Sequence, residues 1–188
     1  MEDFKKRVLE NKLVAIAYSG LLISILSAFT TIIGYTNKMG QHHAFSLLDF
    51  LSDADLIGSF VFKEYTGTVY VQFEGEKVLL LVFLGAVAIF CAFSGLNRLS
   101  KQTDNTISFV LTLFGLIGTM IPSLAILFLV AALKDYYLGA ISYGIYPIVS
   151  PIAMIVCIAA ATQMRRKNNE YREKLKETEG LMFMGGDL

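Results

Sequence analysis

Charged residues are scarce in this sequence and unevenly distributed along it. Only 17% of the 188 residues are charged, whereas 55% are hydrophobic, and the mean hydropathy is +0.58. In an ordinary soluble domain about a quarter of the residues are charged. The scarcity excludes such a domain, and the long uncharged runs are typical of a chain whose solvent is partly lipid. The formal net charge of zero favours no particular partner, and no nucleic-acid partner is expected.

Cysteine is also rare, which limits the covalent chemistry that the chain can carry. The two cysteines, Cys91 and Cys157, both lie inside apolar runs. No water-facing segment can therefore hold a disulfide framework. We interpret both as small apolar side chains, with redox chemistry or lipidation as the alternatives.

Motifs that carry catalysis are missing from the sequence. It contains no Gly-rich phosphate loop, no HExxH, no GxSxG and no cluster of cysteines, so no cofactor is expected. The long apolar runs contain no Asp, Glu, Lys, Arg or His. Ionisable groups inside the membrane usually mark proton or ion coupling, so their absence argues against a pump or a coupled transporter.

Four apolar runs are long enough to cross a bilayer, which requires about 20 residues in a helix. They are Leu13–Tyr35, Val78–Leu96, Ile107–Leu133 and Tyr143–Met164. The sequence therefore predicts an all-α membrane protein, a four-transmembrane-helix bundle, because lipid offers unpaired backbone groups no partners. For the first run, a cleaved signal peptide is the alternative, but its apolar stretch is too long and no small-residue cleavage pattern follows.

The distribution of Lys and Arg predicts the orientation of these spans. Of the 16 such residues, four lie in segments 36–77 and 134–142, and the rest lie in 1–12, 97–106 and 165–188. Positive residues favour the cytoplasmic side, so both termini are predicted to be cytoplasmic. Basic residues next to the first and last spans are expected to anchor the chain at the membrane surface. These predicted anchors are Lys5, Lys6, Arg7, Arg165, Arg166 and Lys167.

The long outer segment, residues 36–77, is predicted to fold into a small α+β unit. Ala44–Asp55 has the apolar periodicity of an amphipathic helix, and Ser59–Glu74 has the strand formers and Thr-Gly turn of a β-hairpin. A lone hairpin is marginal in water, so this one needs a packing partner. Its aromatic side chains are the expected surface for another protein: Phe60, Phe62, Tyr65, Tyr70 and Phe73.

The same segment holds weak candidates for a metal site. His42, Asp49 and Asp53 would share one polar side if the predicted helix began a turn early. Imidazole and carboxylate groups bind divalent metals. Because His42 and Asp49 would be two turns apart, a solvated polar face explains the pattern equally well.

Small residues recur on the first span at three- and four-residue spacing, as at Gly20, Ser24 and Ala28. Within lipid, small residues let helix backbones approach closely. The pattern therefore predicts helix packing inside the bundle, a surface for another membrane subunit or homo-oligomer, or both.

The leading interpretation is a non-enzymatic membrane protein that presents its outer segment and associates with other membrane subunits. An oligomeric channel or permease component is the alternative, and a membrane enzyme that uses His42, His43 and the outer acids is the second. The layout is similar to the tetraspan arrangement of claudin-like proteins, although the aromatic and cysteine signature of their first outer loop is missing. An outer segment without disulfides favours a bacterial plasma membrane.

Overall fold

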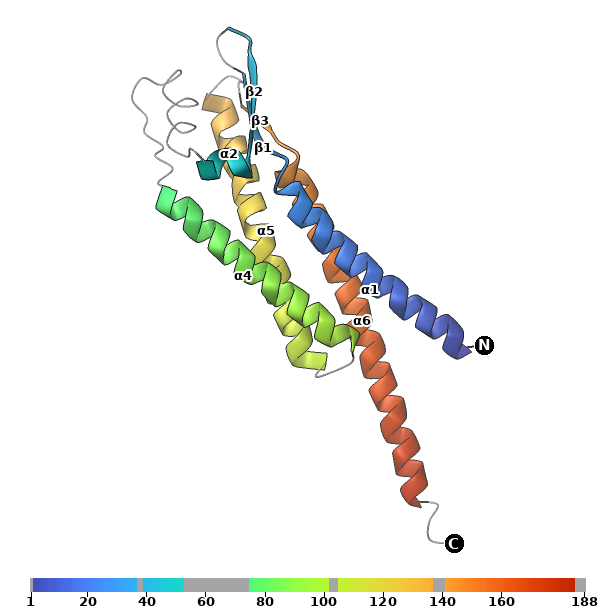
Figure 1. Cartoon of the computed structure of the whole chain (residues 1–188). Coiled ribbons are helices and arrows are strands. Elements are labelled where there is room, and N and C mark those ends of the chain that lie inside the picture. The colour runs from blue at the N-terminus through green and yellow to red at the C-terminus, as the bar shows by residue number, and fades with distance from the viewer. Residues whose placement is uncertain (1, 37–38, 53–74, 102–104, 137–140, 185–188) are drawn as a thin grey trace.

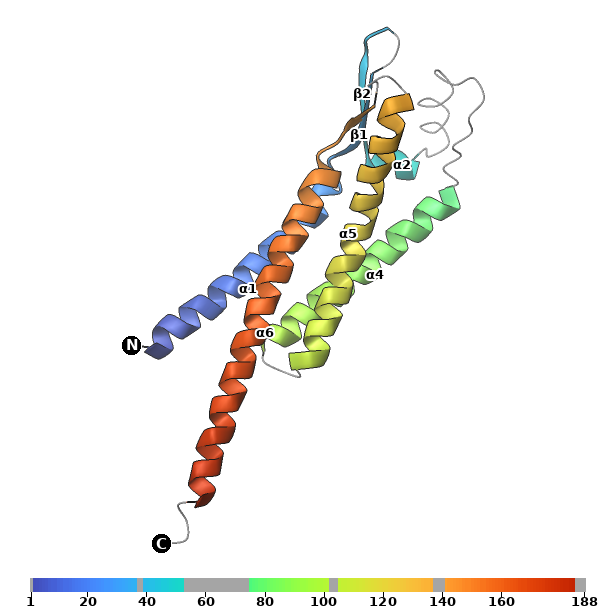
Figure 2. The same ribbon diagram turned by 180° about the vertical axis from the view of Figure 1, so that it is seen from behind.

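A computed structural model describes residues 2–36, 39–52, 75–101, 105–136 and 141–184. Four of its helices are long, and a small sheet lies at one end of them (Figure 1). The elements are α1 (Glu2–Ser27), β1 (Thr31–Thr36), β2 (His42–Ser46), α2 (Leu47–Ser52), α4 (Gly75–Ser100), α5 (Asn105–Tyr136), β3 (Ile141–Tyr143) and α6 (Tyr146–Met184). Both termini lie away from the sheet, as the two opposite views agree (Figures 1 and 2). We call the end with the strands the sheet end.

Three of the described helices are long and apolar enough to cross a membrane, which confirms the predicted helical, membrane-like class. The candidate spans lie within Val82–Ser100, Asn105–Phe128 and Tyr146–Glu177. The apolar part of α1 is shorter, Lys12–Ser27. Large apolar side chains stay exposed along these helices, for example Phe90, Phe114 and Phe128, each with about two thirds or more of its surface accessible.

The prediction that Leu13–Tyr35 forms one helix is wrong at its last part. The helix α1 ends at Ser27, and Thr31–Thr36 forms strand β1. Tight backbone bonds close the helix over the three residues after Ser27, and the Thr30 hydroxyl donates to the Ser27 carbonyl at 2.6 Å. The run that follows is rich in β-branched residues, which pack better in strands than in helices. Hydropathy alone does not distinguish a strand from a helix in this run.

Strand β1 is the centre of an antiparallel three-stranded sheet in the order β2-β1-β3. Gly34 pairs with Ala44 on one side and with Ser142 on the other. The sheet thus joins the neighbouring strands β1 and β2 to β3, which is far away in the sequence. Tyr35 is fully buried in it and stacks on His43, with ring centroids 6.3 Å apart.

The prediction of a helix over Ala44–Asp55 is correct only for its middle. Ala44, Phe45 and Ser46 belong to strand β2, and helix α2 covers Leu47–Ser52. Pairing with β1 holds the first three residues extended, and Ser46 then caps the short helix. The end of that predicted helix and the predicted hairpin over 59–74 lie outside the described residues.

The predicted loop over 134–142 also needs correction. Helix α5 extends to Tyr136, and Ile141 and Ser142 are part of β3. The fourth predicted span begins as a helix at Tyr146 rather than at Tyr143, because Tyr143 is held in the sheet opposite Ile33. At the other end, α6 continues without a break from the apolar run into the charged tail.

The helices pack chiefly in two pairs, α1 with α6 and α4 with α5, and α5 contacts α6 between them. The buried core lies along these contacts, with Leu21, Leu96, Leu116 and Met154 at most 3% exposed. At the sheet end, α5 packs on β3 and α6 contacts β1. The strands therefore tie the ends of separate helices together.

Candidate functional site

Small residues let α1 approach α6 very closely. A Cβ added to Gly20 would lie 2.6 Å from Cys157 Sγ and 2.9 Å from the Ala153 carbonyl oxygen. One turn on, the Ser24 and Ser150 hydroxyls are hydrogen-bonded at 2.7 Å. Gly20 and Ser24, two of the three small residues predicted as an interaction surface, thus contact α6 of the same chain. The third, Ala28, is half-buried just beyond the end of α1.

The pair of α4 and α5 is joined in the same way. Cβ atoms added to Gly115 and Gly118 would collide with Ala88 or Ala92, and one added to Gly95 would meet Ser108 and Thr112. Close backbone approach of this kind is how helices associate where hydrophobic burial gives no driving force.

A cavity of about 330 Å³ lies at the sheet end between α1, α4 and α5. Helix α1 and the turn after it contribute Leu21, Ser24, Ile25, Ala28 and Phe29, and α4 contributes Val82, Gly85, Ala86 and Ile89. The other lining residues are Ile32 and Ile33 of β1, Leu47 of α2, Thr119, Pro122 and Ile126 of α5, and Tyr146 of α6. We call it the sheet-end cavity. Its lining is almost wholly apolar.

The few polar side chains of the sheet-end cavity already have partners within the chain. The Thr119 hydroxyl donates to the Leu116 carbonyl at 2.8 Å and lies 3.1 Å from Met154 Sδ. Ser24 is bonded to Ser150, and Tyr146 forms a side-chain hydrogen bond with the same serine. The cavity is therefore built to surround apolar matter.

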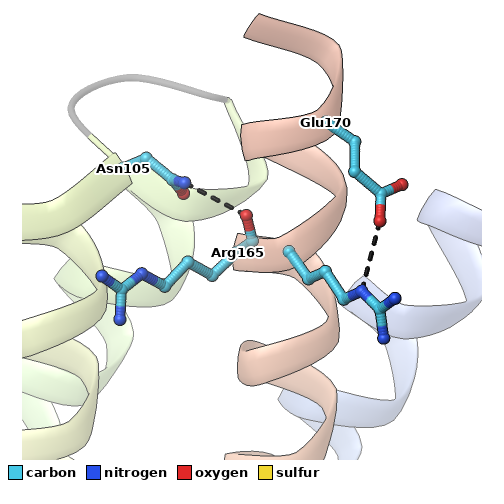
Figure 3. Close-up of polar contacts among 4 residues, drawn as sticks. Asn105, Arg165 and Glu170 are labelled. Atoms are coloured by element: carbon cyan, nitrogen blue, oxygen red, sulfur yellow. Dashed lines mark hydrogen bonds and ion pairs between the residues drawn. The ribbon is translucent and has the colours of Figure 1, made fainter. Parts of the chain in front are cut away.

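A polar cluster fastens the opposite end of the bundle, where α4, α5 and α6 meet. The Asn105 amide donates to the Arg165 carbonyl at 3.1 Å (Figure 3). It also donates to the side-chain oxygen of Asn169. The Asn168 amide donates to the Leu99 carbonyl at 2.9 Å. Buried amides cost free energy unless they are bonded, so these contacts fix the helix ends together.

The predicted surface anchors differ in their placement. Arg165 is half-buried, with its guanidinium 4.5 Å from the centre of the Phe109 ring, a cation–π contact. Arg166 is exposed and pairs with Glu170 at 3.2 Å (Figure 3). Lys167 is half-buried. Lys5, Lys6 and Arg7 are part of α1, and the structure does not describe their side chains.

Two of the three candidate metal residues, His42 and Asp49, have hydrogen-bond partners close to them in sequence. His42 Nδ1 lies 2.7 Å from the Thr36 hydroxyl. The Asp49 carboxylate accepts from the Ser46 backbone at 2.6 Å and from its hydroxyl at 2.7 Å. These bonds lower the pKa of Asp49, with the backbone bond as the main cause. Among the described residues, no group of three or more His, Cys, Asp or Glu side chains could hold a metal ion. Asp53 lies outside the described residues.

The aromatic residues predicted as a partner surface, Phe60, Phe62, Tyr65, Tyr70 and Phe73, lie outside the described residues. Sequence reasoning missed the features that do shape the sheet end, namely β1, β3 and the buried Tyr35. The signal was present in the β-branched run before Gly34.

Comparisons with protein-family models, with curated proteins and with solved structures found no match. The function has to be inferred from the residues and their contacts.

Proposed function

We propose that the chain is a non-enzymatic integral membrane protein that crosses the plasma membrane four times and presents a small outer domain to another membrane subunit. Both termini are cytoplasmic, and the sheet end faces outwards. Support for the orientation comes from the basic residues, which favour the cytoplasmic side. Arg165, for example, lies beside Asn105 at the start of α5, at the end of the bundle opposite the sheet.

The first crossing combines a helix with the central strand. The apolar part of α1, Lys12–Ser27, is about 24 Å long, whereas the hydrocarbon layer is about 30 Å thick. Extended backbone is tolerated at membrane depth only where protein surrounds it and pairs its polar groups. Strand β1 meets this condition, because it is hydrogen-bonded on both sides and its residues Ile32 and Ile33 are buried. In this proposal, strand β1 supplies the length of the crossing that the apolar part of α1 lacks.

The observation that carries the proposal is the way the sheet unites the helices. Strands β1, β2 and β3 come from two separate connections between helices, and β3 packs on α5 while β1 contacts α6. Several hydroxyl groups within the helices bond to backbone carbonyls of their own chain, as Thr112 does to Ser108 at 2.7 Å. The molecule is thus a scaffold with a fixed outer platform, which suits an accessory or interaction subunit.

The proposal is tested by capturing the tagged full-length chain from native membranes in a mild detergent and identifying what remains bound. We expect a stoichiometric membrane subunit or a second copy. Ala44 is exposed on the edge strand β2, so Ala44→Arg should reduce capture of an outer partner. Lys101→Glu, at an exposed position near the opposite end, is the matched control and should leave capture unchanged.

Two results would overturn this function. One is a monomer that brings down no other membrane protein. The other is solute or ion flux through liposomes containing only the purified chain, which would identify a channel or permease component instead.

A further inference from the structure

We propose that the sheet-end cavity is a binding site for one hydrocarbon chain of a membrane lipid, which enters sideways between α1 and α4. This inference rests on the membrane insertion proposed above but not on any protein partner.

The cavity opens to the surface that faces lipid. Phe29 and Ala86 line it and are also exposed, so the mouth lies between the end of α1 and the helix α4. Leu21 and Thr119 line it too and are only 3% and 8% exposed, so it reaches the interior of the bundle. Exposed apolar side chains continue the mouth on both sides, Leu26 on α1 and Phe83 on α4. A lipid chain beside the protein can therefore enter without crossing a polar layer.

The chemistry of the walls selects a hydrocarbon over water or a polar ligand. A buried water needs two to four polar partners. The hydroxyls of Ser24 and Thr119 are already bonded within the chain, and the other lining side chains apart from Tyr146 are apolar. A polar molecule would lose its hydrogen bonds on entry and regain none.

The volume and the walls fit a flexible chain. At about 330 Å³, the cavity lies at the lower end of the range for small-ligand sites. In lipid an apolar ligand gains little from leaving its surroundings, so retention depends on close contacts with the packed walls. Six elements besides the α1–β1 turn supply those walls, including the strand β1 and the short helix α2.

Gly85 provides a direct way to close the cavity. It lines the cavity from α4, and a Cβ added to it would meet no heavy atom within 4 Å. A larger side chain at this position can therefore grow into the open space without striking the backbone of the bundle. Gly85→Leu should occupy the space that a lipid chain would fill, whereas Gly85→Ala should leave most of it open.

The test is native mass spectrometry of the full-length protein, purified in mild detergent and washed until loosely bound lipid is removed. We expect wild type and Gly85→Ala to retain one lipid, and Gly85→Leu to retain it with about tenfold lower occupancy, because side chain and ligand would overlap. Val87→Leu, at an exposed position two residues along α4, is the control for added volume outside the cavity and should behave as wild type.

The mass of the adduct identifies its source. A phospholipid or glycolipid mass supports the proposal, whereas a free fatty acid would show that the cavity takes soluble hydrocarbon chains instead of bilayer lipid. Wild type without an adduct, an adduct that Gly85→Leu retains, or a polypeptide in its place would overturn the proposal. If Gly85→Leu does not fold, Ile126→Trp fills the cavity from α5 and replaces it. A correctly inserted protein with an empty cavity would refute this inference and leave the proposed function standing.

Discussion

Gly20 sets how closely α1 approaches α6. It lies against Ala153 and Cys157, whereas Gly85, in the same kind of apolar helix, lies beside open space. The two glycines therefore allow the same substitution to be compared in a tight contact and in a cavity. The thiol of Cys157 donates to the Ala17 carbonyl at 3.0 Å, so it cannot move aside without losing that bond.

Gly20→Ala should lower the stability of the protein by about 1–3 kcal/mol, because an added methyl group overpacks the contact. Gly85→Ala should leave stability unchanged or raise it slightly, since alanine favours the helix. Heating each variant in the same detergent and measuring the folded fraction by size exclusion gives the comparison. Equal midpoints for the two variants would show that α1 and α6 are not in close contact at Gly20.

Asp49 gives the sheet end a sensitivity to acid. Its carboxylate accepts two bonds from Ser46, while the Asp49 backbone amide approaches the Ser46 hydroxyl at 3.4 Å, the reciprocal arrangement of a capping box. Because the folded state lowers the pKa of Asp49 below its ordinary 3.8, the bonds stabilise α2 at pH values above 3.8. That contribution is lost as the pH falls through the lowered pKa.

Hydrogen exchange over residues 46–52 should therefore accelerate when the pH is lowered below 3.8, after correction for the intrinsic rate. In Asp49→Asn the same segment should exchange faster at neutral pH and show no such acid step. An acid step of equal size in the variant would mean that another group controls the segment.

At the scale of elements, the sequence predicts the apolar helices well and the sheet poorly. The second and third runs lie within α4 and α5, and all but the first three residues of the fourth run lie within α6, because a long uncharged run dictates a helix in lipid. The length of α6 beyond Met164 was not predicted. The first run fails after Ser27, since hydropathy gives Ile32 and Ile33 the same weight in a helix and in a strand. The pairing of β1 with β3 joins residues more than a hundred positions apart, which no local pattern encodes.

The candidate site shows the same division. The small residues of the first span indicated close helix packing, and in the structure Gly20 and Ser24 of α1 contact α6. The sheet-end cavity was not predictable, because its lining residues come from six described elements and look like ordinary apolar positions one by one.

The pairing of β1 with β3 can be tested by a disulfide. Ile33 and Tyr143 are partners across the sheet, and cross-strand neighbours lie within the Cα distance that a disulfide requires. In a chain with Cys91→Ser and Cys157→Ser, the double variant Ile33→Cys and Tyr143→Cys should cross-link under mild oxidation. The control pair, Ile33→Cys with Ile152→Cys further along α6, should not. Cross-linking of the control alone would place the strand elsewhere.

At the scale of the whole molecule, the four long helices alternate in direction and the strands gather at one end, opposite both termini (Figures 1 and 2). This arrangement and the position of the basic residues both support the orientation proposed above. The proposed outer platform and the lipid site both depend on it, because each assigns the sheet end to the outer side.

Labelling with a membrane-impermeant maleimide in intact cells tests that orientation most directly. Single cysteines are placed at the exposed Gln41 in the connection between β1 and β2, at Lys101 beyond α4, and at Glu173 on α6, in a chain without Cys91 and Cys157. We predict that Gln41→Cys is labelled from outside, and that Lys101→Cys and Glu173→Cys are labelled only after the membrane is opened. Labelling of Gln41→Cys and Glu173→Cys from the same side would contradict the account.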